Sequence, residues 1–312
     1  MRFQSTTSRR INYLKYMIAL IVYIFQSPLS AQLLNNSIGE AFTDEPFFNI
    51  ENVRANKIKR ITGHYSTKKI NDQIRPSSLI YVYEFDRLGR LTQKYETVNA
   101  NGGIDTIVTH YEYNANGFLH IKRRTDKSGF YAYVYEYDES GRVVREEFRK
   151  DLNKSGSKVN FIEDKAFLIT FETSSYDNYP LQEKRIYFNS YGKPFQEKFA
   201  YYNEDGYLIE ENEKLKVTSG QKKTFYTYNE KGLLSSVEIQ SSIMGNSTIK
   251  NKFEYDSHSN LISKEIYRND EYTTEIQVVY NEKTGLISAI LTRQVSTNFI
   301  TILRMDEYEF YD

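Results

Sequence analysis

Hydrophobic and polar residues alternate through most of the chain after residue 57, with the period of two that is typical of β-strands. In one such stretch Tyr133, Tyr135 and Tyr137 alternate with Val134 and Glu136, so the three aromatic side chains share one face of the predicted strand. No stretch after residue 57 has the period of an amphipathic helix. The pattern therefore predicts an all-β protein whose strands have one aromatic face and one largely charged face.

A short motif separates these strands and recurs along the chain. Six segments read aromatic residue, Asp or Asn, two variable residues and Gly: YEFDRLGRL from residue 83, YEYNANGFL from 111, YEYDESGRV from 135, YFNSYGKPF from 187, YYNEDGYLI from 201 and YTYNEKGLL from 226. Two more fit with one inserted residue: YDSHSN from 255, where Asn260 replaces Gly, and YNEKTG from 280. The predicted turn positions are Asp86 and Gly89, Asn114 and Gly117, Asp138 and Gly141, Asn189 and Gly192, Asn203 and Gly206, and Asn229 and Gly232.

The motif predicts a type I turn that joins two antiparallel strands. Asp138 at the first position accepts hydrogen bonds from the backbone that follows, and Gly141 at the fourth position takes the left-handed conformation of a G1 bulge. Tyr137 then faces Val143 across the hairpin, and such a pair contributes about 0.2–1 kcal/mol and helps to fix the register. The same register pairs Phe85 with Leu91 and Tyr113 with Leu119.

Continuing the alternation through the first hairpin assigns its two faces. The aromatic face is predicted to hold Tyr81, Tyr83, Phe85, Leu91 and Tyr95, and the charged face Glu84, Asp86, Arg90, Thr92 and Lys94.

The spacing of the motif predicts a meander. Gly89, Gly117 and Gly141 lie 28 and 24 residues apart, which leaves room for two strands and a second turn between successive motifs. Gly192 and Gly206 lie only 14 residues apart, so the NSYG turn is predicted at the opposite edge of the sheet. The fold class is therefore a long up-and-down antiparallel meander of roughly 16–18 strands, forming one twisted or curled repeat sheet. Curling the aromatic face inward would bury it.

The motif resembles the YD repeats of the Rhs family, and the resemblance covers most of residues 57–312. It implies a long β-sheet that winds into a hollow shell around a cargo polypeptide. The chain has no Rhs-type core motif with a Pro- and Gly-rich self-cleavage region, and no toxin-like domain follows the repeats. It is therefore more similar to the short exported YD-repeat proteins of Gram-negative bacteria.

The N-terminus predicts export. Residues 1–31 combine a basic start, the apolar run YMIALIVYIF at 16–25 and small residues before a cut after Ala31, as in a signal peptide. The alternative is an uncleaved short anchor, although ten apolar residues fall short of the roughly 20 that span a bilayer. We expect a periplasmic, outer-surface or secreted protein with no transmembrane span in the mature chain. Residues 32–56 are predicted as an irregular lead-in that covers the first edge strand, and residues 57–312 as the repeat-sheet domain.

Composition narrows the possible chemistry. The 41 basic and 41 acidic residues balance, which argues against a nucleic-acid partner. There is no cysteine, so disulfides, thiol nucleophiles and Cys-based metal sites are excluded. A Gly-x-Ser-x-Gly elbow is absent, and alternating acids are more simply a solvated face than a glycosidase pair.

Two possible metal sites are disfavoured. The hairpin register sets Glu112 opposite His120 with His110 on the same face, but neighbouring basic residues would oppose a cation. The NEDGYLIEE segment from 203 lacks the ligand spacing of a calcium loop. We predict no catalytic residue, no cofactor and no metal site.

The leading hypothesis from the sequence is an exported, non-enzymatic scaffold that contacts an unknown protein or glycan at the cell surface. One alternative is a carbohydrate- or cell-envelope-binding module that uses the tyrosine rows. Another is a remnant or accessory of an Rhs-type toxin system. The tyrosine rows are more simply a core or the lining of a curl than an exposed ligand surface, because soluble proteins rarely expose so large an apolar patch.

Overall fold

The computed structural model describes residues 32–126, 129–243 and 245–312; the predicted signal segment lies outside the described residues. Residues Gln32–Asp312 form one unit. Its elements are α2 (Ile50–Ala55), β1 (Ile58–Lys68), β2 (Arg75–Phe85), β3 (Leu91–Ala100), β4 (Gly103–Tyr113), β5 (Leu119–Asp126), β6 (Gly129–Tyr137), β7 (Val143–Asn153), β8 (Glu163–Tyr179), β9 (Gln182–Phe188), β10 (Pro194–Tyr202), β11 (Leu208–Leu215), β12 (Gln221–Tyr228), β13 (Leu234–Ser241), β14 (Ser247–Tyr255), β15 (Leu261–Arg268), β16 (Glu271–Tyr280), β17 (Ile287–Gln294) and β18 (Phe299–Phe310).

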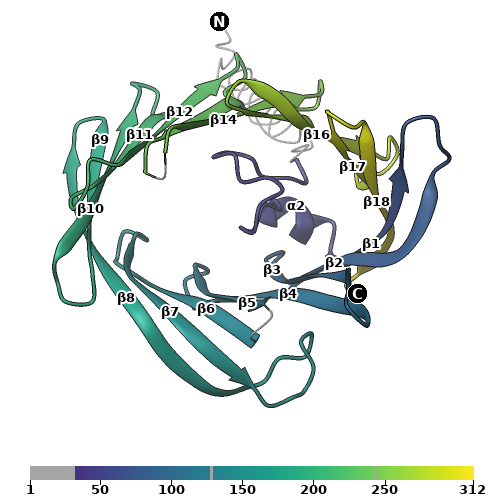
Figure 1. Ribbon diagram of the computed structural model, residues 1–312, viewed down its shortest axis with the longest axis horizontal. Helices are drawn as coiled ribbons and strands as arrows, with labels where there is room; N and C mark the ends of the chain where they lie inside the picture. Colours follow the sequence, from purple (N-terminus) through teal and green to yellow (C-terminus); the bar gives the residue numbers. More distant parts are fainter. Residues whose placement is uncertain (1–31, 127–128, 244) are drawn as a thin grey trace, which may run out of the picture. The chain divides into compact units, whose positions relative to one another are not determined.

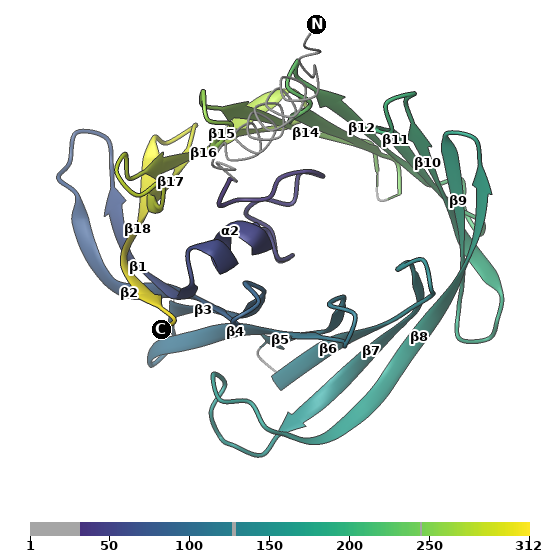
Figure 2. The ribbon, with the colours of Figure 1, turned by 180° about the vertical axis from the view of Figure 1, so that it is seen from behind.

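The strands form a closed barrel. Each strand pairs antiparallel with the next, and the first strand also pairs with the last, so that Ile61 faces Tyr308 and Tyr65 faces Leu303. Figures 1 and 2 show the strands following one another around a ring in chain order. The predicted all-β antiparallel meander is confirmed, with 18 strands. The prediction of an open, twisted or curled sheet is wrong, because the pairing of β1 with β18 leaves no terminal edge strand.

Closure also corrects the family assignment. A sheet of the YD-repeat kind continues by winding, whereas this sheet ends by pairing with its own first strand. The resemblance to the YD-repeat family is therefore wrong for this chain. The reason is that the motif specifies a hairpin turn, which is local, while curvature and closure are set by the twist and stagger of all the strands together.

The predicted turn positions lie at hairpin turns. In the turn from β6 to β7, the N–H of Gly141 donates to the carbonyl of Asp138 at 3.0 Å, and the carboxylate of Asp138 accepts from the N–H of Arg142 at 2.9 Å. The six motif glycines have φ between 71° and 86°, a region that glycine enters without strain. Tyr137 faces Val143 in the register. The NSYG turn joins β9 to β10, at the end of the barrel opposite to the turn from β10 to β11.

A bulge after each turn shifts the faces of the second strand. In the first hairpin Phe85 faces Leu91, but Glu84 faces Gln93, so Thr92 is an extra residue. The prediction that put Tyr95 on the aromatic face and Lys94 on the charged face is therefore wrong. Lys94 faces Tyr83 on the inner side, and Tyr95 faces Val82 on the outer side. This one-residue shift brings charged side chains into the barrel, since it inverts the alternation.

Seven tyrosines link neighbouring hairpins, and five of them stand at the aromatic position of the motif. Each donates its hydroxyl to the carbonyl of the aliphatic residue that follows the preceding turn, where the bulge interrupts the strand ladder. These seven bonds, of 2.5–2.9 Å, form the tyrosine girdle: Tyr113 to Leu91, Tyr137 to Leu119, Tyr176 to Val143, Tyr228 to Leu208, Tyr255 to Leu234, Tyr280 to Leu261 and Tyr308 to Ile287. At these seven positions phenylalanine would leave the carbonyl without this donor.

The lead-in at 32–56 lies inside the barrel, as the ribbon of α2 shows in Figure 1. Asn49 caps the short helix by accepting from the N–H of Glu51 at 3.1 Å. The ring of Phe48 lies 4.8 Å from that of Tyr83 and 5.0 Å from that of Phe85. This segment and the inner faces of β1 to β4 and β13 to β18 make the hydrophobic core.

The outer wall carries ion pairs. Glu275 bonds to Arg293 between β16 and β17, and Lys184 lies 2.9 Å from Glu197 between β9 and β10. The connection from β7 to β8 crosses the outer face of β3 and β4, where the carbonyl of Val159 accepts from the side chain of Gln93 at 2.7 Å. No helix in the described ranges is long and apolar enough to cross a membrane.

Candidate functional site

The two sides of the barrel interior differ in chemistry. Where the lead-in packs, most inner residues are apolar, with Lys94 and Lys264 as charged exceptions. On β5 to β12 the inner residues alternate tyrosines with charged side chains, and this surface is called the polar wall. Its residues are Lys122, Arg124, Tyr131, Tyr133, Tyr135, Glu146, Phe148, Glu172, Arg185, Tyr187, Lys198, Glu211 and Glu213. The polar wall and the charged tip of the lead-in are the parts of the interior able to meet a polar ligand.

Two cavities lie on the polar wall. The larger has a volume of about 1100 Å³ and is lined by Lys122, Arg124, Tyr131 and Asp44 of the lead-in, among others. The smaller, of about 520 Å³, is lined by Glu146, Thr170 and Glu172 together with aromatic residues. Tyr133 and Phe148 line both cavities, so the two are neighbours on one surface.

Three aromatic rings form a platform between the cavities. The ring of Phe148 lies 5.5 Å from that of Tyr131 with an interplanar angle of 13°, and 5.1 Å from that of Tyr133. The β6–β7 register sets Tyr133 directly opposite Phe148, which fixes the platform on two rigid strands. Tyr133 is 39% exposed although it points into the barrel. Within the described residues the hydroxyls of Tyr131 and Tyr133 make no hydrogen bond, unlike the girdle tyrosines.

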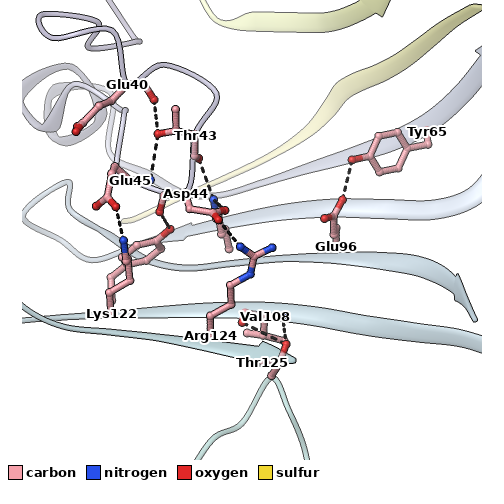
Figure 3. A network of polar contacts seen from close by, with 12 residues as sticks. Glu40, Thr43, Asp44, Glu45, Tyr65, Glu96, Val108, Lys122, Arg124 and Thr125 are labelled. Carbon is pink, nitrogen blue, oxygen red and sulfur yellow. Dashed lines mark hydrogen bonds and ion pairs between the residues drawn. The ribbon is translucent and has the colours of Figure 1, made fainter. Parts of the chain in front are cut away.

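Beside the platform, three cations meet the acidic tip of the lead-in, and Figure 3 shows two of them, Lys122 and Arg124. Lys94 Nζ donates to Asp44 Oδ1 at 3.0 Å and to the carbonyl of Thr43 at 3.0 Å. Arg124 bonds to the other carboxylate oxygen of Asp44, and Lys122 bonds to Glu45. These cations, Lys94, Lys122 and Arg124, are called the cationic trio.

The trio sets the charge of the tip. Burial alone would raise the pKa of Asp44, but the hydrogen bond and charge of Lys94, with the charge of Arg124, hold that pKa below its ordinary value. Asp44 is therefore an anion near neutral pH. Burial lowers the pKa of Lys94, against the opposing effect of Asp44.

The smaller cavity has the opposite character. Glu146 and Glu172 face one another between β7 and β8. Burial raises the pKa of Glu146, and the charge of Glu172 raises it further. Burial also raises the pKa of Glu172, against the lowering effect of Arg185.

A buried lysine holds the lead-in from the other side of the barrel. Lys264 is 5% exposed, and its Nζ donates to the carbonyl of Ala41 at 2.9 Å. The ring of Phe253 lies 5.8 Å away. Burial lowers the pKa of Lys264 from 10.5 to about 8, so the charged form is disfavoured in the folded state.

We predict that Lys264→Met stabilises the protein at neutral pH and that this gain fades at high pH. Between pH 8 and 10.5 the unfolded chain binds the Lys264 proton more tightly than the folded chain, so the free energy of unfolding of the wild type rises with pH in this window. This shift of the Lys264 pKa corresponds to a change in the free energy of unfolding on the order of 3 kcal/mol across the window. Urea unfolding of both proteins between pH 7.5 and 10 measures the difference, and a difference that stays constant with pH would contradict the prediction.

Among the predicted turn residues Asn189 lines the smaller cavity, and the others are not among the residues that line the two cavities. The turn residues are at the ends of the barrel, and the metal geometry considered for His110, Glu112 and His120 does not form. The bulge sets Ile121 opposite Glu112, whose carboxylate bonds to Arg123 at 2.6 Å. His110 contacts Gln93 and the carbonyl of Lys158, and His120 contacts the carbonyl of Tyr135. In the ranges that the structure covers, no group of three His, Asp or Glu side chains is placed to hold a metal ion.

Sequence reasoning missed the acidic tip and the cationic trio. Asp44 and Glu45 lie in a segment without periodicity, and Lys94 and Arg124 belong to strands whose inner face changes after the bulge. A signal for the trio was present in the repeated bulge, because a one-residue shift after each turn moves charged residues inward.

Comparisons with known proteins do not assign a family. No protein-family model matches the chain, and no curated protein matches it. A porin-like protein from Bacteroides uniformis aligns over 81% of this chain and 98% of its own, with 12% identity and a TM-score of 0.36. A porin-like protein from Bacteroides vulgatus aligns over 80% of this chain and 97% of its own, with 10% identity and a TM-score of 0.32. The Tc holotoxin pore of Photorhabdus luminescens aligns over 71% of this chain and 11% of its own, with 14% identity and a TM-score of 0.28. These scores are too low to carry an argument about function.

Proposed function

We propose that this protein is an exported, non-enzymatic binding protein whose barrel holds a carbohydrate on the polar wall. The observation that carries the proposal is the platform of Tyr131, Tyr133 and Phe148, which faces two cavities. Its two tyrosine hydroxyls have no hydrogen-bond partner among the described residues, whereas the girdle tyrosines are bonded. Export rests on the predicted signal segment. The ion pairs of the outer wall suit contact with water, which supports a location in an aqueous compartment of the envelope or outside the cell.

A carbohydrate matches this surface in both shape and polarity. Rigid aromatic rings offer large contact area at low conformational-entropy cost, and the flat C–H faces of sugar rings pack on them. Sugar hydroxyls need donors and acceptors around that contact, which the tyrosine hydroxyls of the platform and the lining of the neighbouring cavities supply. Cavities of about 1100 and 520 Å³ side by side have room for an oligosaccharide rather than a single sugar.

The other functions considered from the sequence have less support. A scaffold that binds protein at the cell surface would use the outer wall, and no observation there favours a particular partner. A role in an Rhs-type toxin system depended on the family resemblance, which the closed barrel corrects. The absence of enzymatic activity is part of the proposal.

The test is binding to a glycan array, followed by titration calorimetry with the oligosaccharides retained. Tyr133→Ala and Phe148→Ala should each weaken binding at least about tenfold, which corresponds to about 1.4 kcal/mol. The matched control is Tyr191→Ala, because Tyr191 is 86% exposed in the turn from β9 to β10 and should leave affinity unchanged. Failure of every glycan to bind, or equal affinity of the platform variants and the wild type, would refute the proposal.

A further inference from the structure

We propose that the polar wall selects acidic sugars, and that a ligand carboxylate takes the places of Glu45 and of one Asp44 oxygen on Lys122 and Arg124. This inference rests on the proposed function and names its substrate class: oligosaccharides that contain uronic acid.

The cations beside the larger cavity are neutralised by the lead-in and not by acids of the wall. Within the described residues, the ion pairs of the cationic trio are made with the tip of the lead-in, and no acid of the wall itself pairs with them. The wall therefore presents a cationic surface that the chain covers with two of its own carboxylates. Asp44 and Glu45 occupy the positions that the carboxylates of a bound acid would take.

Two of the three ion pairs, Arg124 with Asp44 and Lys122 with Glu45, are open to exchange with a ligand carboxylate. Arg124 and Asp44 have side chains about half exposed, at 50% and 49%, and Glu45 is 34% exposed. The pair of Arg124 with Asp44 therefore contributes only about 0–1 kcal/mol, because water competes for both partners. In the other pair Lys122 is 16% exposed, so water reaches it mainly from the side of Glu45. A ligand carboxylate that meets Arg124 in bidentate geometry gains more, since the planar guanidinium matches the two oxygens.

The remaining ion pair, Lys94 with Asp44, keeps the lead-in in place. The Lys94 side chain is 7% exposed and also bonds to the carbonyl of Thr43. Asp44 uses Oδ1 for Lys94 and Oδ2 for Arg124, so it can release Arg124 and remain bound to Lys94. The exchange then needs only a local movement of Glu45 and of the Arg124 side chain, and the apolar core around α2 stays intact.

The aromatic platform lies next to Lys122 and Arg124. Lys122 Nζ lies 5.7 Å from the centre of the Tyr133 ring. The register sets Arg124 opposite Tyr131 and Lys122 opposite Tyr133. A sugar ring stacked on the platform thus has its substituents beside both cations. Glu146 and Glu172 line the other cavity and would repel a second carboxylate there, which orients the ligand.

The test compares tri-galacturonic acid with galactotriose of the same linkage, by titration calorimetry on the mature chain. We expect the wild type to bind the acid at least about tenfold more tightly, with a preference that falls as salt rises. Arg124→Gln should abolish the preference, because it weakens binding of the acid far more than binding of galactotriose. Glu45→Gln should strengthen binding of the acid several-fold, because it removes the internal competitor. Arg293→Gln on the outer wall is the matched control and should change neither affinity, and thermal unfolding checks that each variant folds.

The outcomes separate the two proposals. Equal binding of the acid and the neutral sugar would overturn the acidic-sugar inference and leave the carbohydrate function standing. A preference that persists in Arg124→Gln would overturn the assignment of the carboxylate to this residue. If no glycan on the array and neither trisaccharide binds, the carbohydrate function fails and this inference fails with it.

Discussion

Replacing Asp151 with alanine is expected to lower the free energy of unfolding by about 3–5 kcal/mol, because it leaves a buried cation without its buried partner. The side chain of Arg123 is 2% exposed and that of Asp151 is 1% exposed, and Nε of the arginine donates to Oδ2 of the aspartate at 2.6 Å. The ring of Phe161 covers the guanidinium at 4.2 Å. Glu112 and Glu163 still bond to the guanidinium at 2.6 and 3.1 Å, but both are exposed, so the substitution leaves the buried Nε without a partner where water has little access.

Urea unfolding, followed by far-ultraviolet circular dichroism, measures this loss. Glu112→Ala is the matched control, because Glu112 bonds to the same guanidinium at 2.6 Å but has a side chain 52% exposed. It should cost no more than about 1 kcal/mol. Substituting both partners, Arg123→Met with Asp151→Ala, should recover part of the stability, since no buried charge is then left unpaired. Similar losses for Asp151→Ala and Glu112→Ala would contradict the expected effect of burial.

This buried pair also shows why part of the structure was beyond the sequence. Arg123 and Asp151 are 28 residues apart and look like two more members of an alternating charged face. What buries them is the connection from β7 to β8, which brings Phe161 over the outer face of β5. A strand pattern assigns residues to faces, but it carries no information about which loop folds over a face.

The local structure could be predicted because its determinants are close in sequence. Asp138 and Gly141 specify a turn through hydrogen bonds and a positive φ, and the pairing of Tyr137 with Val143 follows from that turn. The strand number followed from the spacing of the turns. Closure did not follow, because the pairing of β1 with β18 joins residues more than 230 positions apart and depends on curvature accumulated over all the strands.

The candidate site was hidden by the same bulge that the turn motif carries with it. Strict alternation puts Lys94 outside, and one extra residue at Thr92 puts it inside, where it bonds to Asp44. The tip of the lead-in has no periodicity, so nothing local indicates that Asp44 and Glu45 lie against β3 and β5. Sequence reasoning therefore identified the aromatic lining but not the charges beside it.

Gly89→Ala is expected to destabilise the protein more than Gly117→Ala, although the two glycines occupy the same place in the same turn. Their φ angles are 84° and 86°, so the alanine strain of about 1–2 kcal/mol applies to both. They differ in what lies beyond the turn. A Cβ at Gly117 meets nothing within 4 Å, whereas a Cβ at Gly89 would lie 2.3 Å from the carbonyl oxygen of Ile50 and 2.8 Å from the backbone nitrogen of Arg54.

Both of these contacts are backbone atoms of α2, so no side chain can rotate away and the helix itself must move. Such a movement withdraws Val53 and Phe48 from the core and should cost about 1–3 kcal/mol beyond the strain shared with Gly117. Urea unfolding of the two variants measures this difference directly, because the turn strain cancels. Limited proteolysis provides a second measurement: Gly89→Ala should expose residues 32–56 to cleavage, and Gly117→Ala should not. Equal stability losses with equal protection of the lead-in would show that α2 does not depend on the turn between β2 and β3, and the position of the helix inside the barrel would then need another cause.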